Sequence, residues 1–407
     1  MSNILNYSKK ISLVFLGFLL AFIILELCVR ILFSVLPDQY LPSYGIYQST
    51  DPVVGPKLIP ESRGVWSKEG FSKVEINSKG WNDFERQYNK PQDVVRVAIV
   101  GDSFIEALQV PKTDSVASKL ESWLDVNCKY KMDDIRYEVL SFGASGWGTT
   151  QMHLAINNEI IQYDPDFVIM AFFPGNDLKN NIYELELNSN RPYFKIENGS
   201  LIQSSFPTIN NSFKRSAYTF LRDNFLMIQL IREPIVNIFW EFSREEKIKE
   251  SNSESKSNYS DRLELIDRGT WGNDLDNEFV EYSWNLFELI LLKTKEDLND
   301  KNIEFITLVV SRGEVVDNRK NEVEQWAIKN NYSNIFYPED RVENFGKKND
   351  IPVIAISRMM TDLNWDLSKE IAYFHGFGHN LGGGHWNKNG HNLTSSIIGE
   401  KICGLRK

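Results

Sequence analysis

Short apolar runs recur between residues 94 and 173 of this chain and again between residues 303 and 356. They occupy residues 94–100, 137–142, 167–173, 303–310 and 352–356, and they are rich in β-branched or aromatic residues. The run at 167–173 is apolar throughout, as in strands that are buried on both faces of a sheet. The pattern therefore predicts five β-strands.

The segments between these runs carry apolar residues at helical spacing. In residues 115–126, for example, Val116, Leu120 and Leu124 follow one another at intervals of four. We predict helices at 115–126, 151–161, 279–298 and 392–402. A regular alternation of strands and helices is typical of an α/β fold with a doubly wound parallel sheet.

The N-terminus carries a membrane element. Residues 11–25 are almost entirely apolar, and apolar character resumes through Leu36 around Glu26 and Arg30. As a helix, residues 11–36 would span about 39 Å, more than the roughly 30 Å hydrocarbon core of a bilayer. Glu26 and Arg30 are four residues apart, so they share a helix face and can pair near the outer interface.

The charges that flank this helix set its predicted orientation. Lys9 and Lys10 precede it, and no Lys or Arg follows Arg30 until Lys57. This bias favours a cytoplasmic N-terminus with the rest of the chain outside the cytoplasm. We predict an uncleaved, single-pass signal anchor in the cell membrane. A cleaved signal peptide is the alternative, although no convincing cleavage site follows the apolar run.

Composition shifts divide the chain into five predicted parts. These are 1–36 (cytoplasmic tip and anchor), 37–92 (stalk and partly β segment), 93–182 (first part of the core), 183–269 (helical insertion) and 270–407 (second part of the core). Within the insertion, residues 215–240 are strongly apolar and aromatic, which is compatible with a packed helical hairpin, a lid or a membrane-facing surface. Residues 245–260 are polar and predict a loop.

Charge and cysteine content narrow the function. The net charge of −10 and the pI near 5.2 argue against a nucleic-acid-binding protein. Three cysteines are too few for a disulfide framework. We expect Cys128 and Cys403 to be separate buried thiols, and a single bridge between them is the alternative.

Four polar blocks carry the candidate chemistry. Gly101-Asp102-Ser103 directly follows the first predicted strand, and Ser145-Gly146 follows the second. Gly175-Asn176-Asp177 follows the third strand, and Gly384-His385-Trp386-Asn387 precedes the closing helix. In an open α/β sheet the carboxyl ends of the strands form the edge where ligands bind. The first three blocks are therefore expected to lie at neighbouring strand ends.

In this order, the four blocks resemble those of the SGNH (GDSL-type) hydrolase superfamily, which is named for its Ser, Gly, Asn and His. The resemblance covers roughly residues 94–182 and 303–398, and it implies a flavodoxin-like strand order. It also implies that Ser103 is the nucleophile and that His385 takes its proton. The oxyanion would be held by the backbone N–H groups of Ser103 and Gly146 and by the side-chain amide of Asn176.

One residue departs from the family's pattern. The family carries an Asp three residues before the catalytic His, and here that position is Gly382. The acidic partner is therefore missing or supplied from elsewhere, with Asp362 and Asp366 as candidates. A Ser–His dyad is the other alternative.

Four of the five histidines gather in a C-terminal cluster formed by His375, His379, His385 and His391. Their spacing matches no known zinc-ligand pattern, so we predict neither a metal nor a cofactor. We expect His391 to be structural and His153 to lie on a helix face.

These observations predict a serine esterase that cleaves O-acyl groups, among them O-acetyl, from a carbohydrate or lipid outside the cytoplasm. The expected partners are that acylated substrate and the membrane. The alternatives are an O-acyltransferase that modifies an exported glycan, and a catalytically degenerate module that binds glycan or assembles a surface complex.

Overall fold

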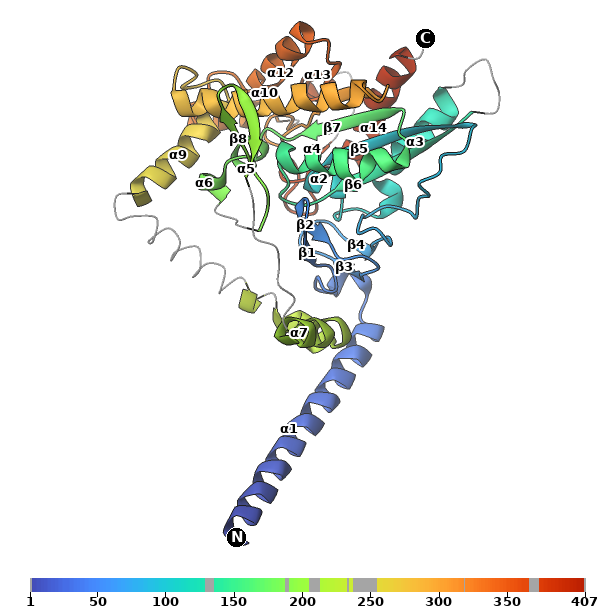
Figure 1. Ribbon diagram of the computed structural model, residues 1–407, viewed down its shortest axis with the longest axis vertical. Helices are drawn as coiled ribbons and strands as arrows, with labels where there is room; N and C mark the ends of the chain where they lie inside the picture. The colour runs from blue at the N-terminus through green and yellow to red at the C-terminus, as the bar shows by residue number, and fades with distance from the viewer. Residues whose placement is uncertain are drawn as a thin grey trace. The chain divides into compact units, whose positions relative to one another are not determined.

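The computed structural model describes residues 2–128, 135–186, 190–204, 213–232, 234–236, 255–317, 319–365 and 373–405. They belong to two compact units, one of residues 1–45 with 210–246 and one of residues 46–209 with 247–407. The second unit contains the sheet and the helices that surround it (Figure 1).

A five-stranded parallel sheet forms the centre of the second unit. Its strands are β5 (Val94–Gly101), β6 (Arg136–Gly143), β7 (Phe167–Phe172), β10 (Glu304–Val309) and β11 (Val353–Ala355). They lie in the order β11-β10-β7-β5-β6, with every neighbouring pair parallel. This is the flavodoxin-like order. The predicted α/β fold, its five strands and its strand order are confirmed.

Helices cover both faces of the sheet. Alternate residues of β5 belong to two different cores: Val97 and Ile99 pack with helices α3 (Val116–Asn127) and α14 (Lys388–Leu405). Ala98 and Val100 pack with α4 (Thr149–Asn158) and α10 (Glu278–Asn299). Because successive side chains of a strand point to opposite faces, a strand covered on both sides is apolar throughout.

Further helices of the second unit complete these layers. They are α2 (Ser103–Glu106), α5 (Asp177–Asn180), α6 (Tyr183–Glu186), α9 (Ser255–Thr270), α11 (Lys320–Lys329), α12 (Tyr337–Lys348) and α13 (Ser357–Trp365).

Of the predicted loop at 245–260, residues 255–260 are the start of α9, so that part of the prediction was wrong. The helix extends through this polar stretch because its later turns pack against α10 through Ile266. Residues 245–254 lie outside the described residues.

A disulfide joins Cys128, at the end of α3, to Cys403 in α14. The Cα atoms of the two residues are 5.6 Å apart. The expectation of two separate thiols was therefore wrong. Sequence separation hid the pair, because α3 and α14 become neighbours only when both pack on the same face of the sheet.

Three β-hairpins flank the sheet. Two lie in the predicted stalk region: β1 (Gln48–Asp51) pairs with β2 (Gly55–Leu58), and β3 (Arg63–Trp66) pairs with β4 (Ser72–Glu75). The third pairs β8 (Phe194–Glu197) with β9 (Ser200–Gln203) inside the insertion, which the sequence analysis described as helical with a polar loop. All three pairs are antiparallel.

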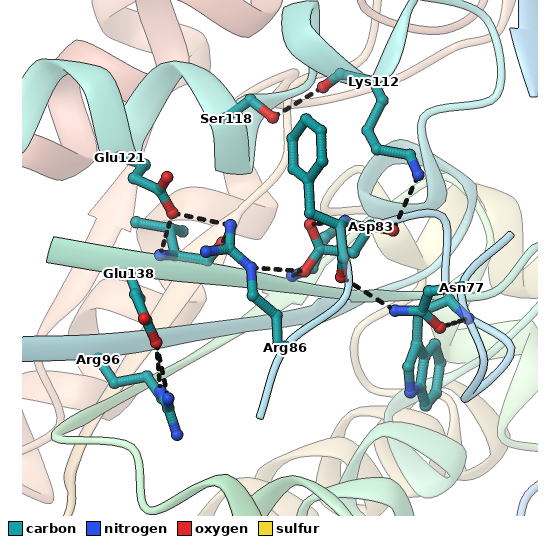
Figure 2. A network of polar contacts seen from close by, with 12 residues as sticks. Asn77, Asp83, Arg86, Arg96, Lys112, Ser118, Glu121 and Glu138 are labelled. Carbon is teal, nitrogen blue, oxygen red and sulfur yellow. Dashed lines mark hydrogen bonds and ion pairs between the residues drawn. The ribbon is translucent and has the colours of Figure 1, made fainter. Parts of the chain in front are cut away.

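Side chains protect the open edge of the sheet at β6. Asp83 accepts a hydrogen bond from the backbone N–H of Ser141 (3.1 Å), and Glu121 accepts one from Val139 (2.9 Å). Arg86 donates to Glu121 at 2.8 Å, which links the stalk region to α3 (Figure 2). The unpaired backbone groups of an edge strand can pair with a strand of another chain and so promote aggregation. Here the side chains of Asp83 and Glu121 occupy two of the N–H groups of β6 and keep other strands from pairing there. Burial raises the pKa of Asp83 to about 6, against the opposing charge of Arg86.

The first unit contains α1 (Ser2–Val35) and α7 (Phe213–Asn224), followed by a helix that begins at Leu226. Residues Lys9–Val35 are long and apolar enough to cross a membrane. The structure thus has the predicted N-terminal apolar helix, and the part of the insertion at 213–232 belongs to the same unit.

Candidate active site

Ser103 is placed by the turn that joins β5 to α2. Asp102 caps the helix: its Oδ1 atom accepts a hydrogen bond from the backbone N–H of Phe104 at 3.0 Å. The strand delivers the chain to the carboxyl edge of the sheet, and the cap turns it at once into a helix. Ser103 is thereby left as the first helical residue, half-buried at that edge.

The structure brings Ser103 together with His385. The Oγ atom of Ser103 lies 2.8 Å from Nε2 of His385, within hydrogen-bond distance. The other ring nitrogen, Nδ1, faces a carboxylate, so it carries the proton when the imidazole is neutral. The Ser103 hydroxyl then donates to Nε2, which is the pairing that general-base catalysis needs.

The carboxylate is Glu69, which the sequence analysis did not single out. Its Oε2 atom lies 2.5 Å from Nδ1 of His385, and its Oε1 atom accepts the backbone N–H of the same residue at 2.7 Å. Glu69 lies in the loop between β3 and β4. Residue 382 is a glycine and offers no carboxylate, and the carboxylate that contacts His385 comes from a residue 316 positions away along the chain.

Gly384 makes this approach possible. Its φ is +71°, and a Cβ added there would lie 2.1 Å from Oε1 of Glu69. Any other residue would therefore push the carboxylate away from the N–H of His385 and would also strain the backbone. The close approach of Glu69 to His385 therefore requires a glycine at position 384.

His385 and Glu69 each favour the charged form of the other. Burial alone would lower the pKa of His385, but the hydrogen bond and charge of Glu69 outweigh it and raise that pKa above 6.5. Burial opposes the ionisation of Glu69, and His385 overcomes this and lowers the pKa of the carboxyl below 4.5. Glu69 is therefore ionised at neutral pH and stabilises the imidazolium that forms when His385 takes a proton.

Asn176 and Gly146 lie at the strand ends next to Ser103. The Nδ2 atom of Asn176 donates to Oδ2 of Asp102 at 3.3 Å, so this amide is held beside the residue that precedes Ser103. The loop of Gly146 follows β6, and Arg191 fixes it by donating from Nη1 to the carbonyl of Gly146 at 2.7 Å. The structure thus brings all four predicted residues to one edge of the sheet.

Glu106 ties the Gly146 loop to the helix of Ser103. It lies at the end of α2 and accepts a hydrogen bond from the hydroxyl of Ser145. The two elements are in close contact, since a Cβ on Gly143 would lie 1.9 Å from the backbone nitrogen of Glu106. Burial raises the pKa of Glu106 to about 7, with the Ser145 hydrogen bonds opposing the shift.

A second histidine supports the loop of His385. His375 is fully buried and donates from Nδ1 to the carbonyl of Gly384 at 2.7 Å. Its Nε2 atom lies 2.8 Å from Oγ of Ser311, which also accepts from Nε1 of Trp386 at 2.9 Å. Desolvation lowers the pKa of His375 to about 4, so this ring is neutral at physiological pH and supports the loop through its hydrogen bonds.

The remaining candidates lie elsewhere. His391 is buried in α14 with its ring against Trp386, and His153 is buried on α4, where Nδ1 lies 2.9 Å from Thr294. Asp362 is exposed on α13, and Asp366 lies outside the described residues. Across the residues that the structure describes, no three His, Cys, Asp or Glu side chains gather to hold a metal ion.

Comparison with known proteins gives structural neighbours only. No protein-family model and no curated protein matches the chain. An acetyl xylan esterase shares 12% identity over 76% of this chain and 100% of its own, with a TM-score of 0.36. A lipase/acylhydrolase from Enterococcus faecalis shares 12% identity over 76% of this chain and 96% of its own (TM-score 0.35).

A GDSL-like lipase from Bacteroides thetaiotaomicron shares 11% identity over 77% of this chain and 89% of its own, with a TM-score of 0.32. Such values assign no activity to this chain. The solved structures to which it is similar thus include a GDSL-like lipase, a lipase/acylhydrolase and an acetyl xylan esterase.

Proposed function

We propose that this protein is a serine-dependent ester hydrolase of the SGNH type that removes O-acyl groups, including O-acetyl, from a carbohydrate or lipid. One observation carries the proposal: His385 bridges the Ser103 hydroxyl, 2.8 Å from Nε2, and the Glu69 carboxylate, 2.5 Å from Nδ1. A nucleophile, a base and a group that orients the base form a hydrolytic triad. This chain of contacts argues against a degenerate binding module.

The residues support an acyl-enzyme mechanism. The Oγ atom of Ser103 attacks the ester carbonyl while its proton passes to Nε2 of His385, and Glu69 stabilises the resulting imidazolium. The N–H groups of Ser103 and Gly146 and the amide of Asn176 would hold the negatively charged oxygen. His385 then returns the proton to the departing alkoxide. Water, deprotonated by the same ring, releases the acid and restores Ser103.

The proposed location is the outer side of the cell membrane. The apolar helix Lys9–Val35 would span the bilayer once, with Lys9 and Lys10 on the cytoplasmic side. The Cys128–Cys403 disulfide supports this location, because disulfides persist in oxidising compartments outside the cytoplasm. The substrate would then be an acylated molecule of the cell surface or envelope.

The test measures acetyl release by the full chain in detergent. Wild type should hydrolyse p-nitrophenyl acetate, and Ser103→Ala and His385→Ala should each lose on the order of 10³-fold or more in kcat. His379→Ala, which changes an exposed histidine of the same loop, is the matched control and should retain full activity. Absence of hydrolysis in wild type, together with no labelling of Ser103 by a fluorophosphonate, would refute the proposal.

A second assay identifies the acceptor. Acetyl release from acetylated oligosaccharide is followed with and without a free glycan acceptor. Formation of new acetylated glycan at the expense of acetate would make the protein a transferase that uses the same triad.

A further inference from the structure

The apolar part of the insertion packs directly against the N-terminal helix. The insertion helices, as we call residues 213–224 and 226–232, are separated only by Phe225. The ring of Phe225 lies against Phe22 of α1, with 5.3 Å between ring centroids. Both segments belong to the first unit, although the contacting residues are about two hundred positions apart along the chain.

One charged pair on α1 satisfies the ends of both insertion helices. Glu26 accepts the backbone N–H groups of Leu226 and Met227, each at 2.9 Å, at the start of the second helix. Arg30 donates to the carbonyl of Asn224, the last residue of α7, at 2.8 Å. The first N–H groups and last C=O groups of a helix lack internal partners, and the helix dipole favours these signs of charge.

The contact leaves Glu26 nearly without exposure to solvent. Its residual exposure is 6%, and Arg30 pairs with it at 2.7 Å. A carboxylate within an apolar helix is unfavourable in a membrane unless it finds partners. Two backbone donors and one guanidinium are such partners. The only acidic residue within the apolar span is thus explained by the insertion helices that dock on it.

The insertion helices keep large apolar side chains on their outer surface. Phe220 is 61% exposed and Ile231 is 49% exposed, and Leu221 is also exposed. Most apolar residues of α1, on which the insertion helices pack, are exposed as well. Exposed apolar side chains on two packed segments mark contact with a membrane or another protein, since water would penalise them by about 25 cal/mol per Å².

Helix geometry gives the depth of this contact. If the hydrocarbon core begins near Lys10, about 20 residues of α1 cross it, and its outer boundary lies close to Arg30. Glu26 is then about 6 Å inside that boundary and Phe22 about 12 Å. The turn around Phe225, which contacts both levels, therefore enters the outer part of the core.

We propose that the insertion helices lie in the outer interface of the lipid bilayer, fixed to the membrane span by Glu26 and Arg30. The occupant of their exposed apolar side chains is the acyl-chain region of the outer leaflet, because the helices that carry them pack on the apolar helix α1 at Phe22, Glu26 and Arg30. This proposal rests on the membrane anchorage proposed above. It gives the insertion the role of a second, monotopic membrane attachment.

The connectivity gives this attachment a consequence. The chain passes between the two units three times, near residues 45, 209 and 246. Three connections of the chain, rather than one, therefore link the unit that holds Ser103 to the unit that holds α1 and the insertion helices.

The test places a fluorescent NBD label on single cysteines of the full chain, in a Cys28→Ser background. The labelled positions are Phe220→Cys and Ile231→Cys, with Ile328→Cys as control. Ile328 is a matched control because it is an exposed apolar residue of α11 in the other unit. The proteins are reconstituted into vesicles of phosphatidylcholine and phosphatidylglycerol, and are quenched in turn by brominated acyl chains and by aqueous iodide.

The labels at 220 and 231 should emit at shorter wavelength, lose most of their emission to brominated lipid and resist iodide. The label at 328 should do the reverse. Equal quenching by iodide at all three positions would overturn the proposal. Protection from both quenchers that grows with the protein-to-lipid ratio would also overturn it, since a second protein copy would then cover the face.

The contacts of Glu26 and Arg30 with the insertion helices, which we call the clamp, are tested separately. The variants are Glu26→Ala and Glu26→Gln in the Phe220→Cys protein. Glu26→Ala should lose most of the lipid quenching, and Glu26→Gln should keep part of it because an amide oxygen still accepts. Ser34→Ala is the control, since that hydroxyl bonds only to Ile31 within its own helix. Unchanged quenching in Glu26→Ala would contradict the clamp.

Hydrolysis of p-nitrophenyl acetate by the same vesicles separates this inference from the proposed function. Lipid quenching without hydrolysis would refute the esterase and leave the membrane attachment intact. Hydrolysis without lipid quenching at 220 and 231 would refute the membrane attachment and leave the esterase intact.

Discussion

At the scale of single residues, the site depends on a carboxylate that comes from outside the core. Glu69 holds His385 through two contacts, one to the ring and one to the backbone N–H. The first fixes the tautomer, and the second fixes the main chain of the loop. A single glutamate in the loop between β3 and β4 thus positions both the ring and the main chain of His385.

Glu69→Gln should lower kcat by about 10²–10⁴-fold, because an amide neither stabilises the imidazolium nor enforces the tautomer. It should also shift the pH dependence. His385 must be neutral to accept the serine proton, so activity rises as pH passes its pKa, which Glu69 holds above 6.5. Without that charge the pKa falls, and the acidic limb of kcat/KM should move to lower pH.

The measurement is the pH profile of kcat/KM for p-nitrophenyl acetate. Glu75→Gln, an exposed glutamate of the same hairpin, is the control and should leave the limb in place. A limb that stays unchanged in Glu69→Gln would show that Glu69 does not set the pKa of His385.

Glu106 gives a second prediction at this scale. Its pKa is about 7 in the folded protein and near 4.5 when exposed, so the folded state binds the proton more tightly. This contribution to stability is fully present below pH 4.5 and is lost as pH rises through about 7. Glu106→Gln should therefore remove a pH-dependent loss of up to about 3 kcal/mol.

Urea unfolding of wild type and Glu106→Gln at pH 5 and pH 8 checks this. The difference in unfolding free energy between the two proteins should move in favour of the variant at the higher pH. Parallel pH dependence in the two proteins would show that Glu106 titrates normally.

At the scale of elements, neighbouring strand ends assemble the site and cross-links stabilise the layers. The disulfide between α3 and α14 joins two helices on one face of the sheet. The stalk region closes the free edge of β6 with Asp83 and Arg86 (Figure 2). Neither feature touches Ser103 or His385, so we expect both to affect stability rather than chemistry.

Cys128→Ser combined with Cys403→Ser should lower the unfolding free energy by roughly 2–5 kcal/mol, because the unfolded chain is no longer constrained. Thermal unfolding with and without a reducing agent measures this. Reduction should lower the Tm of wild type toward that of the double variant, and kcat at low temperature should stay near the wild-type value. A Tm that does not respond to reduction would contradict the bridge.

At the scale of the whole molecule, one chain carries a unit that we propose to be anchored in the membrane and a unit that we propose to be catalytic. The proposed topology predicts labelling by a membrane-impermeant maleimide in right-side-out membrane vesicles, in the Cys28→Ser background. Ile328→Cys should react at once, because its side chain is exposed on the catalytic unit. Tyr7→Cys should react only after the membrane is permeabilised, since it precedes the span. Reaction in the opposite order would reverse the topology.

The sequence by itself determined the local structure of this protein. Periodicity within a few residues located the five strands of the sheet and the helices α3, α4, α10 and α14, because apolar spacing reflects which faces are covered. The same local patterns located Ser103, Asn176 and His385, each next to a strand end or closing helix. The long apolar run likewise marked α1, which is long and apolar enough to cross a membrane.

Only the tertiary structure decided which distant residues meet. Glu69 and His385 are 316 positions apart, the two bridged cysteines 275, and Glu26 and Leu226 200. No local pattern records such pairs, because each partner alone resembles an ordinary surface carboxylate or a buried thiol. They become neighbours when the sheet order and the packing of its helices bring their backbones together. The contact of Glu69 with His385, the disulfide and the contacts of Glu26 on α1 all follow from that step.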